Sequence, residues 1–231
     1  MHKKLELLVI DPSIIRPEIE TFHLIARLSK IPVSFHLPAL EGMDTLWEAE
    51  KSAQCIGAIV LGSAASVREE RDWQTELIRW LKRKIHPHFP LLGICFGHQL
   101  FAHMYGSAVV DVGHKNVGFR KVKIIQDDRL QLSRREVPLF VAHNDKVNDV
   151  PNGFEIFASS DSITIDGLRH KTLPIWGFQP HIDATETFAL NSHYSDRTHF
   201  SDLKEGNDLL NKFLEFTSRC AREQAGKRQN L

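Results

Sequence analysis

Residues 90–100 read Pro-Leu-Leu-Gly-Ile-Cys-Phe-Gly-His-Gln-Leu, and this stretch indicates how the chain folds. The apolar run Leu91–Ile94 is typical of a buried parallel strand, and a helical pattern follows it at once. Glycines two residues on either side of Cys95 are typical of a tight turn between strand and helix, where a side chain would clash. Such a turn lifts Cys95 beside the first free N–H groups of the helix, which stabilise a thiolate and a developing oxyanion. Two interpretations are open from these residues: Cys95 is a nucleophile, or it is a buried cysteine in a glycine-flanked turn.

The longer string Gly93–Gln99 resembles the nucleophile motif of the class I (triad-type) glutamine amidotransferases. That family pairs its cysteine with a histidine in a later Gly-x-Gln-x-His-x-Glu string, and Gly177–Asp183 is similar to it. The two matches occur in the family's order. The second is imperfect, because the family usually has Phe-His-Pro-Glu where this chain has Pro-His-Ile-Asp at residues 180–183.

The resemblance implies a catalytic triad. Cys95 is then the nucleophile that attacks the side-chain amide of glutamine, and His181 is the base and acid. Asp183 takes the position of the family's glutamate and orients the imidazole, although it is one methylene shorter. A second interpretation makes Asp183 the N-cap of a helix that begins at residues 184–186, and the two roles are compatible.

The oxyanion hole requires backbone N–H donors next to the nucleophile. The resemblance places one at Phe96 and another in the loop that begins Gly62-Ser63. The Gly-Ser-x-x-Ser form of this loop resembles stand-alone family members similar to the GMP synthetase amidotransferase domain. The alternative is an ordinary short loop of good turn residues.

The resemblance also implies a substrate-binding set. Gln99 corresponds to a family residue that helps to hold the amino-acid end of glutamine. Residues 141–147 resemble the Ser-His-x-Asp-x-Val segment that lines the family's glutamine pocket, which assigns His143, Asn144 and Asp145 to substrate binding. This segment has Ala142 in place of the usual serine, and an ordinary edge loop is the alternative.

Composition narrows the class of protein. The chain has 231 residues, enough for a well-covered core, and 29 basic side chains balance 29 acidic ones. We therefore expect neither a nucleic-acid nor a membrane partner. Three widely spaced cysteines argue against a disulfide framework and favour a reducing cytoplasm. No metal-binding spacing is recognisable, and the resemblance implies no cofactor.

Alternating strand and helix patterns over residues 5–105 predict right-handed βαβ units. We expect a single domain over residues 1–231, with a three-layer α/β fold. Its central sheet is mostly parallel, with helices on both faces and a small antiparallel flank, the flavodoxin-like fold that the resemblance also implies. The expected elements include helices at 17–30 and 47–55, a helix capped by Asp72, and a C-terminal helix over about 203–222 followed by a frayed tail. The flank is expected from five short strands at 108–112, 118–125, 137–142, 154–159 and 163–168.

Three functions remain open. The first is a glutaminase-type hydrolase that releases ammonia and glutamate. Because no P-loop appears in the sequence, its ammonia would serve a separate synthetase subunit. The second is a γ-glutamyl peptidase or hydrolase. Both reactions would pass through a γ-glutamyl thioester on Cys95. The third is a catalytically weak regulatory or binding subunit, which Asp183 and Ala142 would favour. An α/β-hydrolase triad is a weaker alternative, because it leaves the Gly177–His181 string unexplained.

Overall fold

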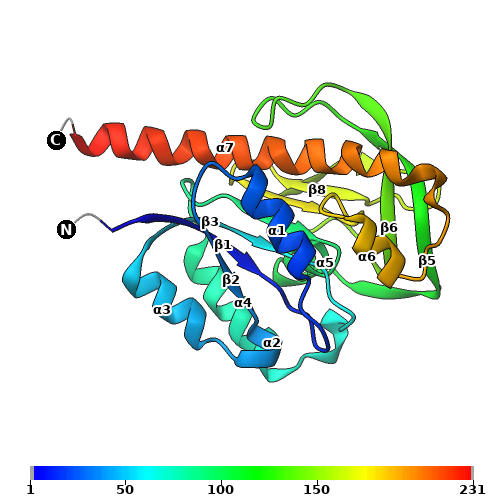
Figure 1. Ribbon diagram of the computed structural model, residues 1–231, viewed down its shortest axis with the longest axis horizontal. Coiled ribbons are helices and arrows are strands. Elements are labelled where there is room, and N and C mark those ends of the chain that lie inside the picture. The colour runs from blue at the N-terminus through cyan, green and yellow to red at the C-terminus, as the bar shows by residue number, and fades with distance from the viewer. Residues whose placement is uncertain (1–2, 230–231) are drawn as a thin grey trace.

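The computed structural model describes residues 3–229 and contains a nine-stranded mixed sheet in the order β2-β1-β3-β4-β9-β8-β7-β5-β6 (Figure 1). The strands are β1 (Leu5–Ile10), β2 (Val33–His36), β3 (Gln54–Val60), β4 (Leu91–Ile94), β5 (Val109–Ile124), β6 (Arg135–Val147), β7 (Phe154–Ser159), β8 (Gly167–His170) and β9 (Ile175–Phe178). The helices are α1 (Ile19–Leu28), α2 (Pro38–Glu41), α3 (Asp44–Ser52), α4 (Asp72–Lys84), α5 (Phe96–Met104), α6 (Glu186–Asn191) and α7 (Leu203–Gln229), with 3₁₀ turns η1 (Val67–Glu69) and η2 (Arg197–Asp202).

The parallel part of the sheet has a hydrophobic layer on each face. Along β1, Leu7 and Val9 pack with the buried side chains of α1 and α7, whereas Leu8 and Ile10 pack with those of α3, α4 and α5. This follows from the alternation of side chains along a strand, and it explains why residues 7–10, which are covered on both faces, are all apolar. The expected three-layer α/β fold is confirmed.

The five strands in the order β2-β1-β3-β4-β9 are all parallel. Their carboxyl ends therefore meet at one edge of the sheet. The chain passes from β1 to β2 on one side and then returns to β3 on the other side of β1, so α1 lies on one face while α3 and α4 lie on the other. In open α/β sheets the crevice at such a switch point, beyond the strand ends, is where ligands bind.

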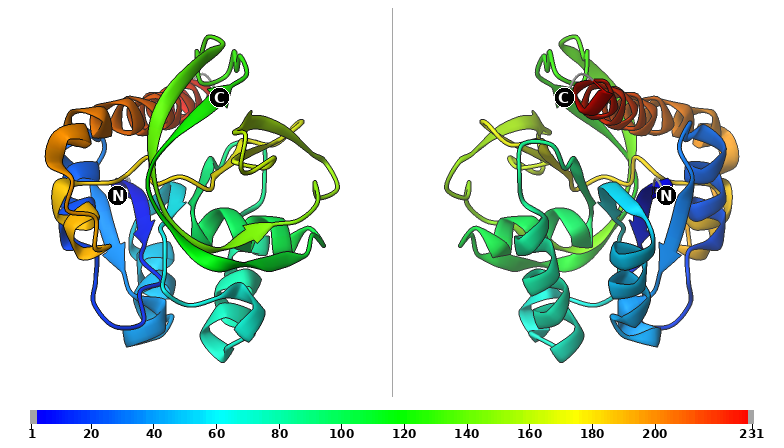
Figure 2. Two further views of the ribbon diagram at one scale, coloured as in Figure 1. Left: turned by 90° about the vertical axis from the view of Figure 1, so that its right-hand side faces the viewer. Right: turned by 90° about the vertical axis from the view of Figure 1, so that its left-hand side faces the viewer.

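The antiparallel flank contains the longest strands. Strands β5 and β6 pair from Val109↔Val147 to Ile124↔Arg135, with a register shift between Asp111 and Asn116. Figure 2 shows this hairpin as a curved green ribbon that arches beside the parallel strands. The strands expected at 108–112 and 118–125 are therefore one bent strand, because the register shift lets pairing resume after the polar segment between them.

Several expected boundaries are wrong. The strand expected at 163–168 is β8, which begins only at Gly167. Helix α4 is capped by Arg71, and Asp72 is its first residue; Gln74 Oε1 accepts from the Arg71 N–H at 2.9 Å. The helix expected at 47–55 is α3, which starts at Asp44 and ends before Gln54 joins β3. Helix α7 continues past Arg222 to Gln229 because residues 223–229 are mostly strong helix formers.

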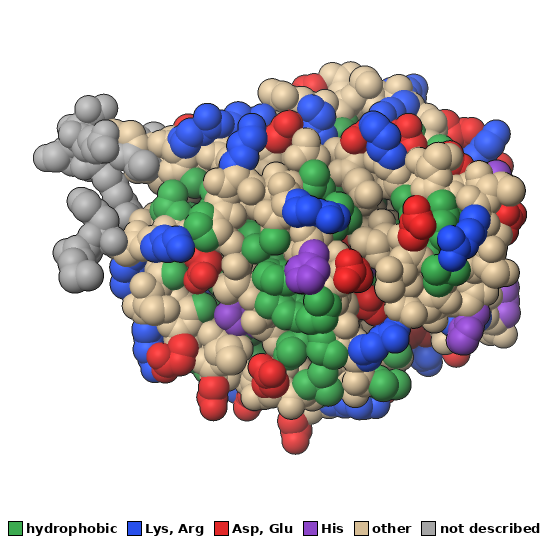
Figure 3. Space-filling view, in the orientation of Figure 1, with side chains coloured by type: hydrophobic (Ala, Val, Ile, Leu, Met, Phe, Trp, Pro, Cys, Tyr) green, Lys and Arg blue, Asp and Glu red, His purple; other side chains and the backbone are tan. Residues whose placement is uncertain are grey.

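On the face shown in Figure 3, basic and acidic side chains are interspersed, and both signs occur along α7 at the top of the view. Hydrophobic side chains gather in the centre of this face. Within residues 3–229, no helix is long and apolar enough to cross a membrane.

Candidate functional site

The turn between β4 and α5 holds Cys95 in a strained conformation. Cys95 has φ 51° and ψ −100°, a region that non-glycine residues rarely adopt. A Cβ added at Gly93 would lie 2.4 Å from the backbone of Gly97, and one added at Gly97 would lie 2.2 Å from the carbonyl oxygen of Val60. The two glycines therefore permit the close packing of strand, turn and helix that the sequence predicted.

Cys95 and His181 meet because β4 and β9 are parallel neighbours. Ile94 pairs with Phe178, and the Cys95 N–H donates to the Phe178 carbonyl at 2.8 Å. Three residues beyond β9, the His181 N–H donates to the carbonyl of Phe140 on β6 at 2.8 Å. The sheet thus anchors the backbone on both sides of the cysteine–histidine pair.

Asp183 reaches the imidazole of His181. Its Oδ1 lies 3.2 Å from His181 Nδ1, and Asp183 and His181 are 3% and 4% exposed. Burial by itself lowers the pKa of His181, but the charge of Cys95 and hydrogen bonds with Asp183 and Cys95 outweigh it and raise this pKa to about 10. The site is therefore built to hold a protonated histidine beside the sulfur.

The interpretation of Asp183 as a helix cap is wrong. Helix α6 begins at Glu186 and its N-cap is Thr185, whose hydroxyl accepts from the Phe188 N–H at 3.1 Å. The cap lies two residues later, and Asp183 is instead turned toward His181. Helix α6 serves the site in another way, since the Phe188 ring lies 4.3 Å from the imidazole, centroid to centroid.

The loop after β3 lies directly over the pair. A Cβ at Gly62 would be 2.6 Å from His181 Cε1 and 3.6 Å from the Cys95 Cβ, so glycine leaves the room that the imidazole occupies. The Ser63 hydroxyl donates to the Pro12 carbonyl at 2.7 Å and accepts from the Ala65 N–H at 3.0 Å. Its side chain thus holds the loop in shape. Phe96 is fully buried with its ring against Trp73, and only its backbone is available to the site.

The expected substrate-binding residues lie on the opposite wall, where β6 passes Cys95. Gln99 is 3% exposed and donates from Nε2 to the Asp145 carbonyl at 2.9 Å. His143 Nδ1 lies 3.0 Å from the same carbonyl, and burial lowers the pKa of His143 to about 4. Asn144 is exposed at the mouth. The carbonyl of Ala142 lies 3.9 Å from Cys95 Sγ.

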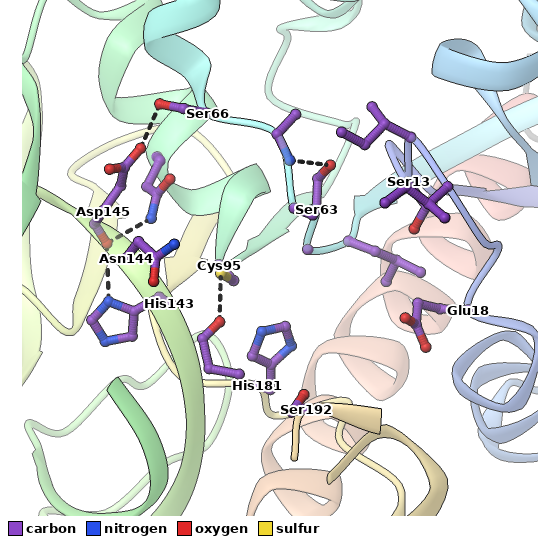
Figure 4. A pocket seen from close by; sticks show the side chains of 18 of the residues that line it. Ser13, Glu18, Ser63, Ser66, Cys95, His143, Asn144, Asp145, His181 and Ser192 are labelled. Carbon is purple, nitrogen blue, oxygen red and sulfur yellow. Dashed lines mark hydrogen bonds between the residues drawn. The ribbon is translucent and has the colours of Figure 1, made fainter. Parts of the chain in front are cut away.

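These residues surround a cavity of about 780 Å³, seen in Figure 4. The cavity is lined by all the expected site residues except Phe96, namely Cys95, His181, Asp183, Gly62, Ser63, Gln99, His143, Asn144 and Asp145. The cavity also continues along residues 13–18, after β1, and residues 191–193, after α6.

Two parts of the site were missed by sequence reasoning. Asp145 accepts hydrogen bonds from the Ser66 hydroxyl and from Arg68 Nη2, the latter at 2.9 Å. No local signal marks Arg68, because its partner lies 77 residues away. The sequence marks Asp11 only as the end of a strand, yet its carboxylate accepts from the N–H groups of Ser13 and Glu18 and shapes the loop that forms the cavity wall.

Glu18 adds a second carboxylate near the triad. Burial raises its pKa, and the charges of Asp11 and Asp183 raise it further. Asp11 itself is fully buried, and burial raises its pKa as well. Glu18 thus lies close enough to Asp183 and His181 to interact with the charges of both, while its raised pKa favours the neutral acid.

The fold is an open α/β sheet in which Cys95 lies on a strained turn between β4 and α5. The His181–Asp183 pair follows β9, the strand beside β4 in the sheet. These features define an α/β protein of the cysteine-triad type. The sequence model of the family described as glutamine amidotransferase class-I matches residues 23–196. The chain belongs to the class I glutamine amidotransferase family.

Known relatives agree with this assignment. The chain is 38% identical over 104 residues to one subunit of the glutamine-hydrolysing GMP synthase of Methanocaldococcus jannaschii, a match that covers 45% of this chain and 55% of that protein. The chain spans about half to two thirds of the length of such curated relatives.

Solved structures share the fold. A protein of Thermoplasma acidophilum described as one subunit of GMP synthase superposes with a TM-score of 0.74 at 22% identity, covering 97% of this chain and 100% of that chain. A glutamine amidotransferase of Thermotoga maritima gives a TM-score of 0.68 at 18% identity, covering 94% and 99%.

Proposed function

We propose that the chain hydrolyses the side-chain amide of glutamine to glutamate and ammonia through a γ-glutamyl thioester on Cys95. The observation that carries this proposal is the buried alignment of Cys95, His181 and Asp183, in which the Asp183 Oδ1 lies 3.2 Å from His181 Nδ1. The charge of Cys95 and hydrogen bonds with Asp183 and Cys95 raise the pKa of His181 and so favour a protonated imidazole. That contact also supports activity over the regulatory alternative, which depended on the shorter Asp183 and on Ala142 in place of the usual serine.

In the first half-reaction the Cys95 thiolate attacks the amide carbon of the side chain. The amide oxygen becomes an oxyanion, for which the Phe96 N–H and the backbone of the Gly62–Ser63 loop are the proposed donors. His181 transfers its proton to the amide nitrogen, the C–N bond breaks, and ammonia leaves. The products of this step are the thioester and a neutral His181, whose orientation Asp183 maintains.

In the second half-reaction His181 takes a proton from water as the oxygen attacks the thioester carbon. The C–S bond then breaks, which restores the thiolate beside the imidazolium and releases the product with a γ-carboxylic acid; this acid loses its second water proton to solvent to give glutamate. Atoms and protons balance without any cofactor.

The opposite wall is the proposed site for the amino-acid end of glutamine. Asp145 is a carboxylate at the cavity surface, 7% exposed and already held by Ser66 and Arg68. Such a fixed carboxylate suits an α-amino group, because it needs no reordering when the substrate arrives. Gln99, His143 and Asn144 complete this wall.

The ammonia would serve a separate synthetase subunit. The support is the name of the relatives, each described as one subunit of a glutamine-hydrolysing GMP synthase. Because the chain spans only part of their length, the acceptor remains a proposal to be tested by adding candidate synthetases to the assay.

One observation favours a γ-glutamyl peptide or conjugate as a second candidate substrate. The cavity of about 780 Å³ continues past His181 along residues 13–18 and 191–193, which leaves space for an amine larger than ammonia. Cavities of this size hold ligands larger than a single amino acid.

The test is a turnover assay of purified protein with glutamine and, separately, with γ-glutamyl dipeptides, in which ammonia and free amino acids are measured independently. We expect turnover that disappears in Cys95→Ala and His181→Ala. Cys55→Ala is the matched control, since Cys55 is a half-buried free cysteine outside the cavity. Absence of turnover with every γ-glutamyl compound, with or without cell extract, would establish the regulatory alternative instead.

A further inference from the structure

Gln179 lies directly behind the candidate nucleophile. It is 0% exposed, and its side chain spans from Gln99 to Cys95. Its Nε2 is 3.7 Å from Cys95 Sγ, within hydrogen-bond range for sulfur. Cys95 lines the cavity while Gln179 is fully enclosed, so the amide approaches the sulfur from the side that substrate does not occupy.

The hydrogen-bond network determines which way this amide points. The carbonyl of Asp145 can only accept, so the atom of Gln99 that lies 2.9 Å from it must be the nitrogen Nε2. That same nitrogen lies 3.2 Å from the side-chain amide of Gln179, which must then offer its oxygen. The Gln179 NH₂ group is therefore left facing Cys95 Sγ.

The backbone keeps Gln179 in this position. Its N–H donates to the carbonyl of Asp166 at 2.8 Å, directly after β9 ends. Gln179 is thus held by its backbone N–H and by its side-chain oxygen, which leaves the side-chain NH₂ directed at Cys95 Sγ. An amide fixed in this way costs no reorganisation when charge develops on the sulfur.

We propose that Gln179 is a catalytic residue that stabilises the thiolate of Cys95 by donating an N–H hydrogen bond to Sγ. A thiol sulfur is a weak acceptor and a thiolate a strong one, so a fixed donor favours the charged form. The carbonyl of Ala142, 3.9 Å from Sγ, acts in the opposite direction, because it accepts from a thiol and repels a thiolate. Gln179 acts against that carbonyl, as does the imidazole of His181, which Asp183 contacts from the far side.

The same chain of contacts links the nucleophile to the substrate wall. It runs from the Asp145 carbonyl through Gln99 and Gln179 to Cys95 Sγ. This part of the inference rests on the proposed function, since Asp145 is the proposed partner of the substrate. A movement of Gln99 when substrate binds would therefore be transmitted to Cys95 Sγ by the side-chain amide of Gln179.

The test measures the thiolate directly and does not require turnover. Gln179→Met keeps a long unbranched side chain without any N–H donor. Gln179→Glu keeps an acceptor for Gln99 but turns a carboxylate oxygen toward Sγ. Iodoacetamide alkylation of Cys95 is followed against pH by peptide mass spectrometry in the wild type and both variants.

We expect the alkylation rate of Cys95 near pH 7 to fall about tenfold in Gln179→Met, with the rising limb of the pH profile moved up by about one unit. Gln179→Glu should move the rising limb of the Cys95 pH profile further, because a like charge then faces the thiolate. Cys55 and Cys220 in the same samples are internal controls. They are half-buried and lie away from the cavity, so their labelling should not change.

A structural role for Gln179 predicts a different result. Loosened packing would speed the labelling of Cys55 and Cys220 and lower the melting temperature while the pH profile of Cys95 stayed in place, and that pattern would overturn the proposal. An unchanged Cys95 profile in well-folded variants would overturn it too. If the wild type hydrolyses no γ-glutamyl compound but the profile still moves, the proposed function fails and the thiolate contact stands.

Discussion

Asp183 occupies the position where the family string has glutamate, and its shorter side chain still reaches His181. The segment of residues 180–183 leaves β9 and packs tightly under α7: Ile182 is fully buried, and a Cβ on Gly206 would lie 3.0 Å from the Ile182 Cα. This packing holds the backbone on either side of Ile182, from His181 to Asp183. The Asp183 Oδ1 to His181 Nδ1 distance of 3.2 Å is the result.

The orienting role of Asp183 can be tested by removing its charge. We expect Asp183→Asn to lower kcat by about 10-fold to 10³-fold with the fold intact, because an amide can favour the wrong imidazole tautomer and no longer stabilises the imidazolium. Asp183→Glu keeps the carboxylate and should retain most of the activity. Steady-state kinetics with glutamine would check this, and wild-type kcat and kcat/KM in Asp183→Asn would assign the orienting role to another group.

At the scale of elements, each part of the site comes from a connection at the carboxyl edge of the parallel strands. Asp11 follows β1, Gly62 follows β3, Cys95 follows β4 and His181 follows β9. Short, regular strands fix where these connections start, and the connections carry the polar groups. The long hairpin β5–β6 supplies the remaining wall, through Ala142 and Asp145.

The edge strand β2 ends in a histidine whose charge state should affect stability. His36 is 4% exposed, its ring nitrogens contact the hydroxyls of Ser34 and Thr45, and burial lowers its pKa to about 4. Between pH 6.5 and about 4 the unfolded chain therefore binds a proton at His36 that the folded chain does not. The contribution of neutral His36 to the free energy of unfolding is therefore fully present above pH 6.5 and is lost as the pH falls toward 4.

A comparison with His36→Gln isolates this effect. We expect the free energy of unfolding of the wild type to fall relative to that of the variant by about 1 to 3 kcal/mol as the pH is lowered across that range. Urea unfolding at a series of pH values measures the difference. A difference independent of pH would mean that His36 is not neutral in the folded protein.

At the scale of the whole molecule, α7 closes the layer that it shares with α1. Leu209, Leu210, Phe213 and Leu214 are all at most 3% exposed. Trp176 of β9 meets the rings of Phe213 and Phe216 edge-on, at 6.1 and 5.1 Å between centroids. Because β9 also leads to His181, α7 supports the strand that carries the histidine.

Truncation of Phe213 tests how much this layer contributes. We expect Phe213→Ala to lower the free energy of unfolding by about 3 to 5 kcal/mol, because it leaves a cavity between α7 and the sheet. Val150→Ala, at a side chain that is 42% exposed, should change it by no more than about 0.5 kcal/mol. Chemical denaturation of both variants gives the comparison. Equal changes in the free energy of unfolding in the two variants would show that the packing of α7 does not contribute to the stability of the core.

The sequence by itself determined the local features: the alternation of strands and helices, the glycine-flanked turn at Cys95 and the two motif strings with their residue types. These follow from interactions within a few residues, such as the exclusion of a Cβ at Gly93 and Gly97. Boundaries were less certain where propensity competes with pairing, as at the end of α7 and along the bent β5.

Only the tertiary structure decided which distant groups meet. It placed β9 beside β4, so that His181 faces Cys95; it joined Arg68 to Asp145; and it set the amide of Gln179 against the sulfur. Sequence spacing contains no distance between residues on different strands. Those distances arise when the strands pair and the buried polar groups must find partners, which is why Gln179 could be read in a motif without its contact being foreseen.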